Sequence, residues 1–195
     1  MNSFLPHFSL VGLVGLLFPL VAPAAVNALV GSDGTIYFEA VPRLLNASAT
    51  RQLSGVQGST LRFTIEVPQG AGVPLGQIHL TQDQNFEALR ISPDRITAVE
   101  GAQFSDSALR VPMRAEVPDF GERQPIEITF DPPLPAGTTV TLGLRPSRTP
   151  QTSGVYQFGI VALPAGDQPF EYFLNYGRIN FFERDRDRDG IFLVD

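Results

Sequence analysis

The closing segment of the chain, ERDRDRDGIFLVD at residues 183–195, holds the most suggestive set of metal ligands in the sequence. Three aspartates in alternate positions, followed by a glycine, match positions 1, 3, 5 and 6 of the calcium loop that lies between two helices. A backbone carbonyl at position 7 and the two carboxylates of the last residue would extend the set. The predicted calcium ligands are Asp185, Asp187, Asp189, Ile191 and Asp195.

The same segment also fits a solvated tail. Leu193, at loop position 9, has no side-chain oxygen, and the chain ends before the glutamate of position 12. Arg184, Arg186 and Arg188 alternate with the aspartates, so the segment is close to neutral, and charged alternation at a chain end usually indicates a solvated tail. We therefore expect no cofactor, with calcium bound weakly at the tail as the alternative.

A second group of residues suits anion binding. Arg43, Arg145, Arg148 and Arg178 fall at expected strand ends or in turns, and clustered guanidinium groups can hold a phosphate or an acidic sugar. The alternative is that each arginine pairs with a carboxylate on the rim of an acidic domain. All fourteen basic residues are Arg and the net charge is −6, which excludes nucleic acid as an expected partner. The partner is otherwise unknown, with an envelope protein or a polysaccharide as the candidates.

Residue types that most catalysis requires are scarce. The chain has no Cys, and His79 is the only histidine after residue 28, so most zinc sites and any Cys–His pair are excluded. His79 lies opposite Ile78 and Leu80 in GQIHLTQ, which predicts a half-exposed strand residue, and we predict no catalytic residue. The remaining enzyme hypothesis is a carboxylate-based hydrolase, which needs two carboxylates about 5 to 9 Å apart. The glutamates considered for that pair are Glu39, Glu66, Glu87, Glu116 and Glu127.

The elements that must position these residues are strands. Segments such as TLRFTIEV, IEITF, TTVTLGLR and GVYQFGIVAL alternate apolar and polar residues, and Gly and Pro separate them. We expect an all-β, single-domain antiparallel β-sandwich of roughly seven to nine strands, with a small open β-barrel as the alternative. SPDRITAVEG could start a short helix, with Ser92 as its cap. Alternation favours core positions for the aromatics of FEYFLNYGRINFF, with carbohydrate stacking as the alternative.

The first 28 residues have the pattern of a secretory signal peptide, with an apolar run over 8–21 and small residues before Leu29. An uncleaved membrane anchor over residues 8–26 is the alternative. We therefore divide the chain into a signal peptide at 1–28, a β-sandwich domain at 29–182 and a charged tail at 183–195. Export to the periplasm, the cell envelope or the extracellular space is expected.

Several longer motifs resemble those of a known family. They are PPLPAGTT at 132–139, GLRP at 143–146, SGVY at 153–156 and YGR at 176–178. The chain resembles an exported cyanobacterial family catalogued as domain of unknown function 2808, from GTIYFEAVPRLLNASAT to about Phe182. The resemblance implies export to the cell envelope and a compact β domain, and it implies no reaction.

Three functions follow from these observations. The first is an exported, non-catalytic cell-envelope domain that acts as a structural or binding module. The second is a calcium-dependent binding or assembly module that uses the Asp-rich tail. The third, which the residue types favour least, is the carboxylate-based hydrolase.

Overall fold

The computed structural model describes residues 29–83, 87–105, 107–117, 119 and 125–183. The only helical element within these residues is the 3₁₀ turn η1 at Pro93–Arg95. The described strands are β1 (Leu29–Val30), β2 (Ile36–Tyr37), β3 (Arg43–Ala49), β4 (Leu61–Glu66), β5 (Leu75–Gln82), β6 (Ile96–Glu100), β7 (Arg110–Val111), β8 (Met113–Glu116), β9 (Ile126–Leu134), β10 (Thr139–Leu144), β11 (Gly154–Pro164) and β12 (Tyr172–Phe181). No described helix is long and apolar enough to cross a membrane.

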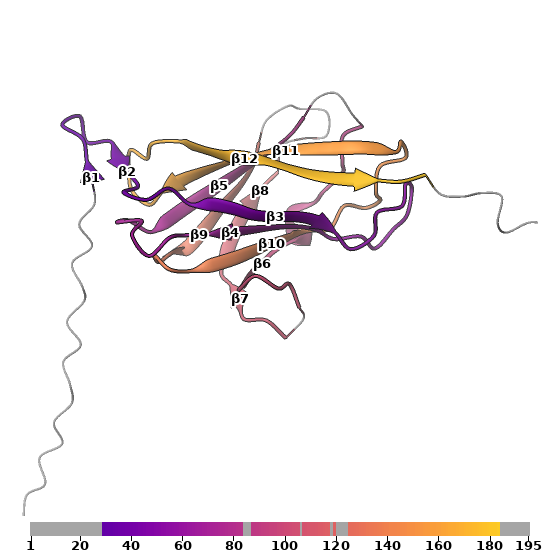
Figure 1. Cartoon of the computed structure of the whole chain (residues 1–195), viewed down its shortest axis with the longest axis horizontal. Coiled ribbons are helices and arrows are strands. Elements are labelled where there is room, and N and C mark those ends of the chain that lie inside the picture. Colours follow the sequence, from indigo (N-terminus) through magenta and orange to yellow (C-terminus); the bar gives the residue numbers. More distant parts are fainter. Residues whose placement is uncertain (1–28, 84–86, 106, 118, 120–124, 184–195) are drawn as a thin grey trace, which may run out of the picture.

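Ten of these strands form two five-stranded sheets that pack face to face (Figure 1). Sheet I has the order β3-β4-β10-β6-β7, and sheet II has the order β12-β11-β5-β9-β8. Every strand pair in both sheets is antiparallel. The strands β1 and β2 form a separate small ribbon at one end. The expected antiparallel β-sandwich is confirmed.

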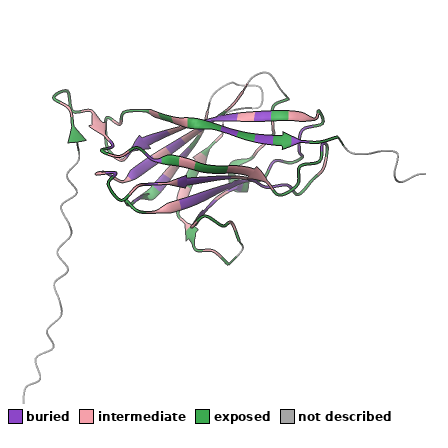
Figure 2. Ribbon diagram, in the orientation of Figure 1, coloured by how far each residue is buried: buried purple, intermediate pink, exposed green. Residues whose placement is uncertain are grey.

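The core lies between the sheets and is filled by alternate residues of each long strand (Figure 2). The inward residues expected from TLRFTIEV, TTVTLGLR and GVYQFGIVAL are all buried. They are Leu61, Phe63, Ile65, Val67, Val140, Leu142, Leu144, Tyr156, Phe158, Ile160 and Ala162. Because period-two alternation places these side chains on one face of each strand, the two sheets need no disulfide to form a continuous apolar layer.

The two sheets are connected in a different way along each long side of the sandwich. On one side only Pro112 separates β7 from β8, so the chain passes directly from the edge of sheet I to the edge of sheet II. On the other side, backbone hydrogen bonds join both ends of β12 to the segments that flank β3. The amide of Ile36 donates to the carbonyl of Gln168 (2.8 Å), and that of Phe182 donates to Gln52 (2.7 Å).

Gly177 allows the edges of the two sheets to approach between those hydrogen bonds. A Cβ atom at this buried position of β12 would lie 2.8 Å from the ring of Phe63 and 2.9 Å from the Cβ of Ala47. Any larger residue would therefore push β12 away from β3 and β4. The Tyr-Gly-Arg motif contains this glycine, and the close contact explains its need for Gly.

Three details differ from the sequence-based expectations. The described residues contain more strands than expected, because strands of only two to four residues form the separate ribbon (β1 and β2) and one edge of each sheet (β7 and β8). The short helix expected after Ser92 is only the turn η1, and Ser92 makes no capping hydrogen bond. β6 follows at once because its alternate residues enter the core. The Pro-rich segment expected as a turn instead belongs in part to β9, which runs through Pro132 to Leu134.

Candidate anion-binding site

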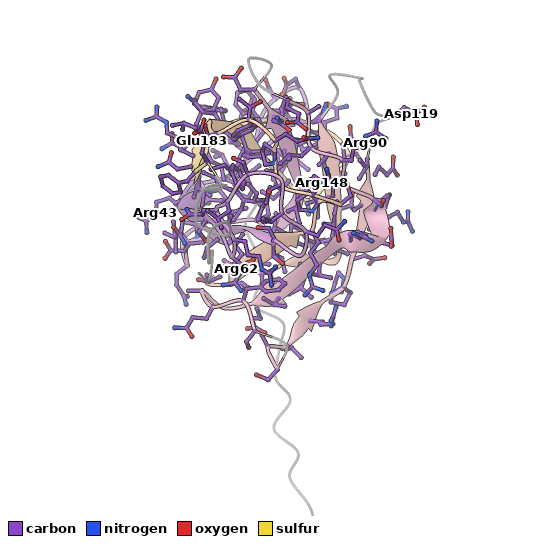
Figure 3. The ribbon with its side chains drawn as sticks, turned by 90° about the vertical axis from the view of Figure 1, so that its right-hand side faces the viewer. Arg43, Arg62, Arg90, Asp119, Arg148 and Glu183 are labelled. Atoms are coloured by element: carbon purple, nitrogen blue, oxygen red, sulfur yellow. The ribbon has the colours of Figure 1, made fainter. Side chains whose placement is uncertain are left out.

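An open pocket with a volume of about 370 Å³ lies at the end of sheet I where β4 begins and β10 ends. It is formed by the β3–β4 loop, the end of η1, the β6–β7 loop and the residues after β10. Figure 3 views the molecule from this end. We call it the arginine pocket, and it is lined by Thr50, Gly58, Ser59, Thr60, Arg62, Arg95, Phe104, Ser105, Arg145 and Pro146.

One wall of the pocket is built by Phe104, which lies on the outer face of sheet I. Gly143 of β10 has no side chain, and the ring of Phe104 occupies the place where a Cβ atom would stand. The hydroxyl of Thr141 donates to the carbonyl of Gly101 (2.7 Å) and lies 3.0 Å from that of Thr64. These contacts hold the β6–β7 loop against the sheet, and both threonines are buried beneath it.

Arg62 is the most restrained of the three arginines that line the pocket. It lies directly beside Gly143 in the β4–β10 register, and its guanidinium carbon is 5.4 Å from the centroid of the Phe104 ring. Its Nε atom is buried and has no hydrogen-bond partner among the described residues. The cation–π contact fixes the side chain at the pocket wall. Because Arg62 also lines the pocket, its guanidinium group is a candidate donor to a bound anion.

Arg95 and Arg145 complete the positive lining. The backbone amide of Arg145 donates to the carbonyl of Arg95 (3.1 Å), so the two residues lie side by side after β10 and before β6. No carboxylate is found among the described lining residues. The ion pair between Arg43 and Glu66 (2.7 Å) lies at the opposite end of sheet I. The described lining residues therefore offer no negative charge to offset the three arginines.

Hydroxyl groups add neutral donors to this lining. Thr50 Oγ1 accepts a hydrogen bond from the amide of Thr60 (2.8 Å), which leaves its own hydroxyl proton free to donate. Ser59 already donates to the carbonyl of Arg51 (2.9 Å), so it stabilises the loop. The pocket can thus offer guanidinium groups from several directions and at least one hydroxyl to an oxyanion. Such charge-assisted hydrogen bonds are the strongest that proteins form with phosphate or carboxylate.

The structure separates the four arginines that the sequence suggested as a cluster. Arg145 lines the pocket, and Arg148 follows at the same end of the molecule (Figure 3). Arg43 begins β3 at the opposite end, where it is paired with Glu66, and Arg178 lies exposed on β12 of sheet II. Only one member of the expected set therefore lines the pocket.

Arg62 and Arg95 were missed because their position depends on tertiary contacts. The alternation of TLRFTIEV correctly predicted that Arg62 points away from the core. Nothing local to that strand shows that the β6–β7 loop returns to meet it. The available signal was Gly143, because glycine inside a strand often marks a close approach of another segment.

The other candidate residues lie away from the pocket. His79 is half-buried on the outer face of β5, opposite the buried Ile78 and Leu80 as predicted, and its ring contacts the Gln77 side chain (3.3 Å). Among the glutamates, Glu116 and Glu127 face each other across β8 and β9, but both are exposed on a sheet face outside the pocket.

The predicted calcium ligands at residues 185–195 lie outside the described residues, so that site stays a prediction. Within the described ranges, no group of three or more His, Asp or Glu side chains is arranged to hold a metal ion.

Several solved structures are similar to this structure at low sequence identity. BslA, a bacterial hydrophobin, is 17% identical, with 74% of this chain and 96% of that chain covered at a TM-score of 0.42. ACE19, the collagen-binding subdomain of the Enterococcus faecalis surface protein ACE, is 9% identical, with 72% and 98% covered at a TM-score of 0.38. No curated protein matches the sequence. A family model described as protein of unknown function (DUF2808) matches residues 35–181, and the chain therefore belongs to the DUF2808 family.

Proposed function

We propose that this chain is an exported, non-catalytic binding module of the cell envelope that holds an anionic group of its partner in the arginine pocket. The observation that carries the proposal is the convergence of Arg62, Arg95 and Arg145 on one pocket whose described lining contains no carboxylate. The partner is an envelope polysaccharide or protein that bears phosphate, sulfate or carboxylate groups.

The charge of the whole chain makes the pocket selective. A net charge of −6 repels polyanions from most of the surface, so favourable contact is confined to the positive end. Arg62 gives the greatest specificity, because its side chain is already held against Phe104 and loses little freedom on binding. Arg95 and Arg145 are exposed and add attraction that salt weakens.

The lining favours binding over catalysis. Arginine stays protonated and cannot act as a general base at neutral pH. Among the described residues that line the pocket, none is a histidine or a carboxylate that could activate a hydroxyl as a nucleophile. Retention of an anion is the role that these residue types support. Export and a cyanobacterial source, which the signal-like N-terminus and the family resemblance imply, belong to the same proposal.

The test is isothermal titration of the purified protein at low salt with pyrophosphate, dextran sulfate and polygalacturonate. We expect at least one of the three to bind. Arg62→Gln and Arg145→Gln should each weaken that binding about 10- to 100-fold, because each removes charge-assisted hydrogen bonds of roughly 1.5–3 kcal/mol. Arg178→Gln is the matched control, since it removes the same charge from an exposed site on sheet II. Equal affinity for all three variants, or no binding by any probe, would refute the proposal.

A further inference from the structure

A β-bulge in β12 brings two aromatic side chains to the same outer face of sheet II. Phe173 pairs with Val161 of β11, whereas Asn175 pairs with Ile160, so one extra residue, Leu174, is inserted between them. In a regular strand, residues three apart point to opposite faces. The bulge cancels that alternation, and Phe173 and Tyr176 both face solvent. Bulges commonly re-aim side chains in this way near binding sites.

The two rings form a pair above a glycine. Phe173 and Tyr176 are 55% and 48% exposed, and their ring centroids lie 5.0 Å apart in an edge-to-face arrangement. Gly159 of β11 lies beneath them, and a Cβ atom there would be 3.6 Å from each ring. Both rings are therefore supported from below while part of each stays open to solvent. We call Phe173, Tyr176 and Gly159 the aromatic platform.

Two polar, uncharged residues, Thr81 and Asn175, adjoin the aromatic platform. Thr81 of β5 is exposed and pairs with Gly159 of β11. Tyr176 of β12 pairs with the same glycine from the other side. The side-chain oxygen of Asn175 accepts a hydrogen bond from the Tyr176 amide (2.8 Å), which leaves the Asn175 NH₂ group free to donate. Hydroxyl and amide groups around a bare ring are the groups that recognise a sugar, whose C–H face stacks on the ring while its hydroxyls bond to the rim.

The size of the aromatic platform argues against a protein partner. A large aromatic side chain buries about 150–250 Å², so two half-exposed rings offer roughly 200 Å² of apolar surface. A stable protein–protein interface needs about 800 Å² from each partner. The platform is therefore too small to hold a second copy of the chain by itself, and its area matches one or two sugar rings.

We propose that the aromatic platform binds a neutral polysaccharide, with one pyranose ring stacked on Tyr176 or Phe173 and its hydroxyls bonded to Thr81 and Asn175. The exposed residues two positions before Phe173 and two positions after Tyr176, Glu171 and Arg178, carry opposite charges, so along β12 the platform has no net charge that would favour an acidic chain over a neutral one. This site lies on the outer face of sheet II and shares no residue with the arginine pocket on sheet I.

Affinity electrophoresis of the full chain tests this proposal. Native gels would contain hydroxyethyl cellulose, soluble starch, xylan or galactomannan, with a polysaccharide-free gel as reference. We expect at least one polymer to retard the protein, and Tyr176→Ala and Phe173→Ala each to weaken that retardation at least fivefold. Phe182→Ala is the matched control, because Phe182 is also 55% exposed but lies beyond the end of β12.

The outcomes separate this proposal from the one concerning the arginine pocket. Retardation that survives Arg62→Gln and Arg145→Gln but not Tyr176→Ala supports the aromatic platform alone. Retardation by none of the four polymers overturns the proposal, as does retardation that both aromatic variants retain in full. Self-association in analytical ultracentrifugation that Tyr176→Ala abolishes would also overturn it, because the rings would then contact a second copy. Circular dichroism of each variant confirms that the fold is retained.

Discussion

Replacing Gly143 by Ala tests whether Phe104 prepares Arg62 for an anion. The new methyl group would occupy the space that the Phe104 ring now fills on β10. Strand β10 is held on both sides by β4 and β6, whereas Phe104 belongs to a loop. The ring must therefore move away from the sheet, and Arg62 loses the surface against which its guanidinium lies.

The expected effect on stability is small. Displacing a half-buried phenylalanine costs about 1 kcal/mol, and the lost cation–π contact costs roughly 0.5–1 kcal/mol. Alanine in place of glycine within a strand recovers roughly 0.5–1 kcal/mol. Gly143→Ala should therefore fold, with a free energy of unfolding about 1 kcal/mol below that of the native protein, as urea titration can measure.

The expected effect on anion binding is larger. A freed arginine side chain must be ordered again on binding, at a cost of about 1–2 kcal/mol, which corresponds to a 5- to 30-fold loss of affinity. No charge changes, so electrostatic attraction alone predicts no loss. Gly159→Ala is the control, because its Cβ would lie at 3.6 Å or more from every neighbour. Wild-type affinity in Gly143→Ala would refute the role assigned to Phe104.

Three further predictions concern other parts of the chain. Tyr156→Phe removes the hydrogen bond from the tyrosine hydroxyl to the carbonyl of Thr152 (3.0 Å) and should lower the free energy of unfolding by about 1 kcal/mol in urea titrations. Burial, and to a smaller extent a nearby glutamate, raise the pKa of Tyr156, so the folded state holds this proton more tightly than the unfolded chain. Stability from this group is complete below the unfolded pKa of about 10 and falls as pH rises further, and unfolding of Tyr156→Phe between pH 9 and about 11 should lack that fall. Glu116→Gln removes like-charge repulsion from Glu127 across β8 and β9 and should raise thermal stability by roughly 0.2–1 kcal/mol, an effect that high salt should reduce. If the tail binds calcium, saturating calcium should stabilise the protein by roughly 2.7 kcal/mol at a hundred times the dissociation constant, and Asn at the aspartates of 185–189 should abolish the shift; equal melting with calcium and chelator would exclude a stabilising site.

The inner half of the sandwich could be predicted because burial there obeys one local rule. Phe63, Leu142 and Ile160 enter the core simply because alternate residues of a strand share a face. The same rule identified His79 as an outward residue of β5. The sequence could not show the short edge strands, since their pairing depends on where the sheets end and on the passage through Pro112.

The outer faces could not be predicted in the same way. Alternation in TLRFTIEV places Thr64 on the outer face of its strand, yet Thr64 is buried because the β6–β7 loop covers it. Phe173 and Tyr176 lie in an aromatic segment for which alternation favoured the core, yet the bulge at Leu174 turns both toward solvent. Both proposed binding sites arise where a loop or a bulge interrupts the regular strand pattern, and the pattern alone contains no information on such interruptions.

The position of the arginine pocket determines from which end of the molecule a ligand would reach it. β1 and β2 lie at one end of the sandwich, and the loops of the pocket lie at the other, next to the end of β12 (Figure 1). Residues 1–28 precede β1 directly, so a chain retained in a membrane by that segment would present the pocket at its far end. A chain cleaved before Leu29 would instead carry its ligand freely. Mass spectrometry of the N-terminal peptide of the native protein distinguishes the two arrangements: an intact residue 1–28 segment supports display from the membrane, and a peptide that begins at Leu29 rules it out.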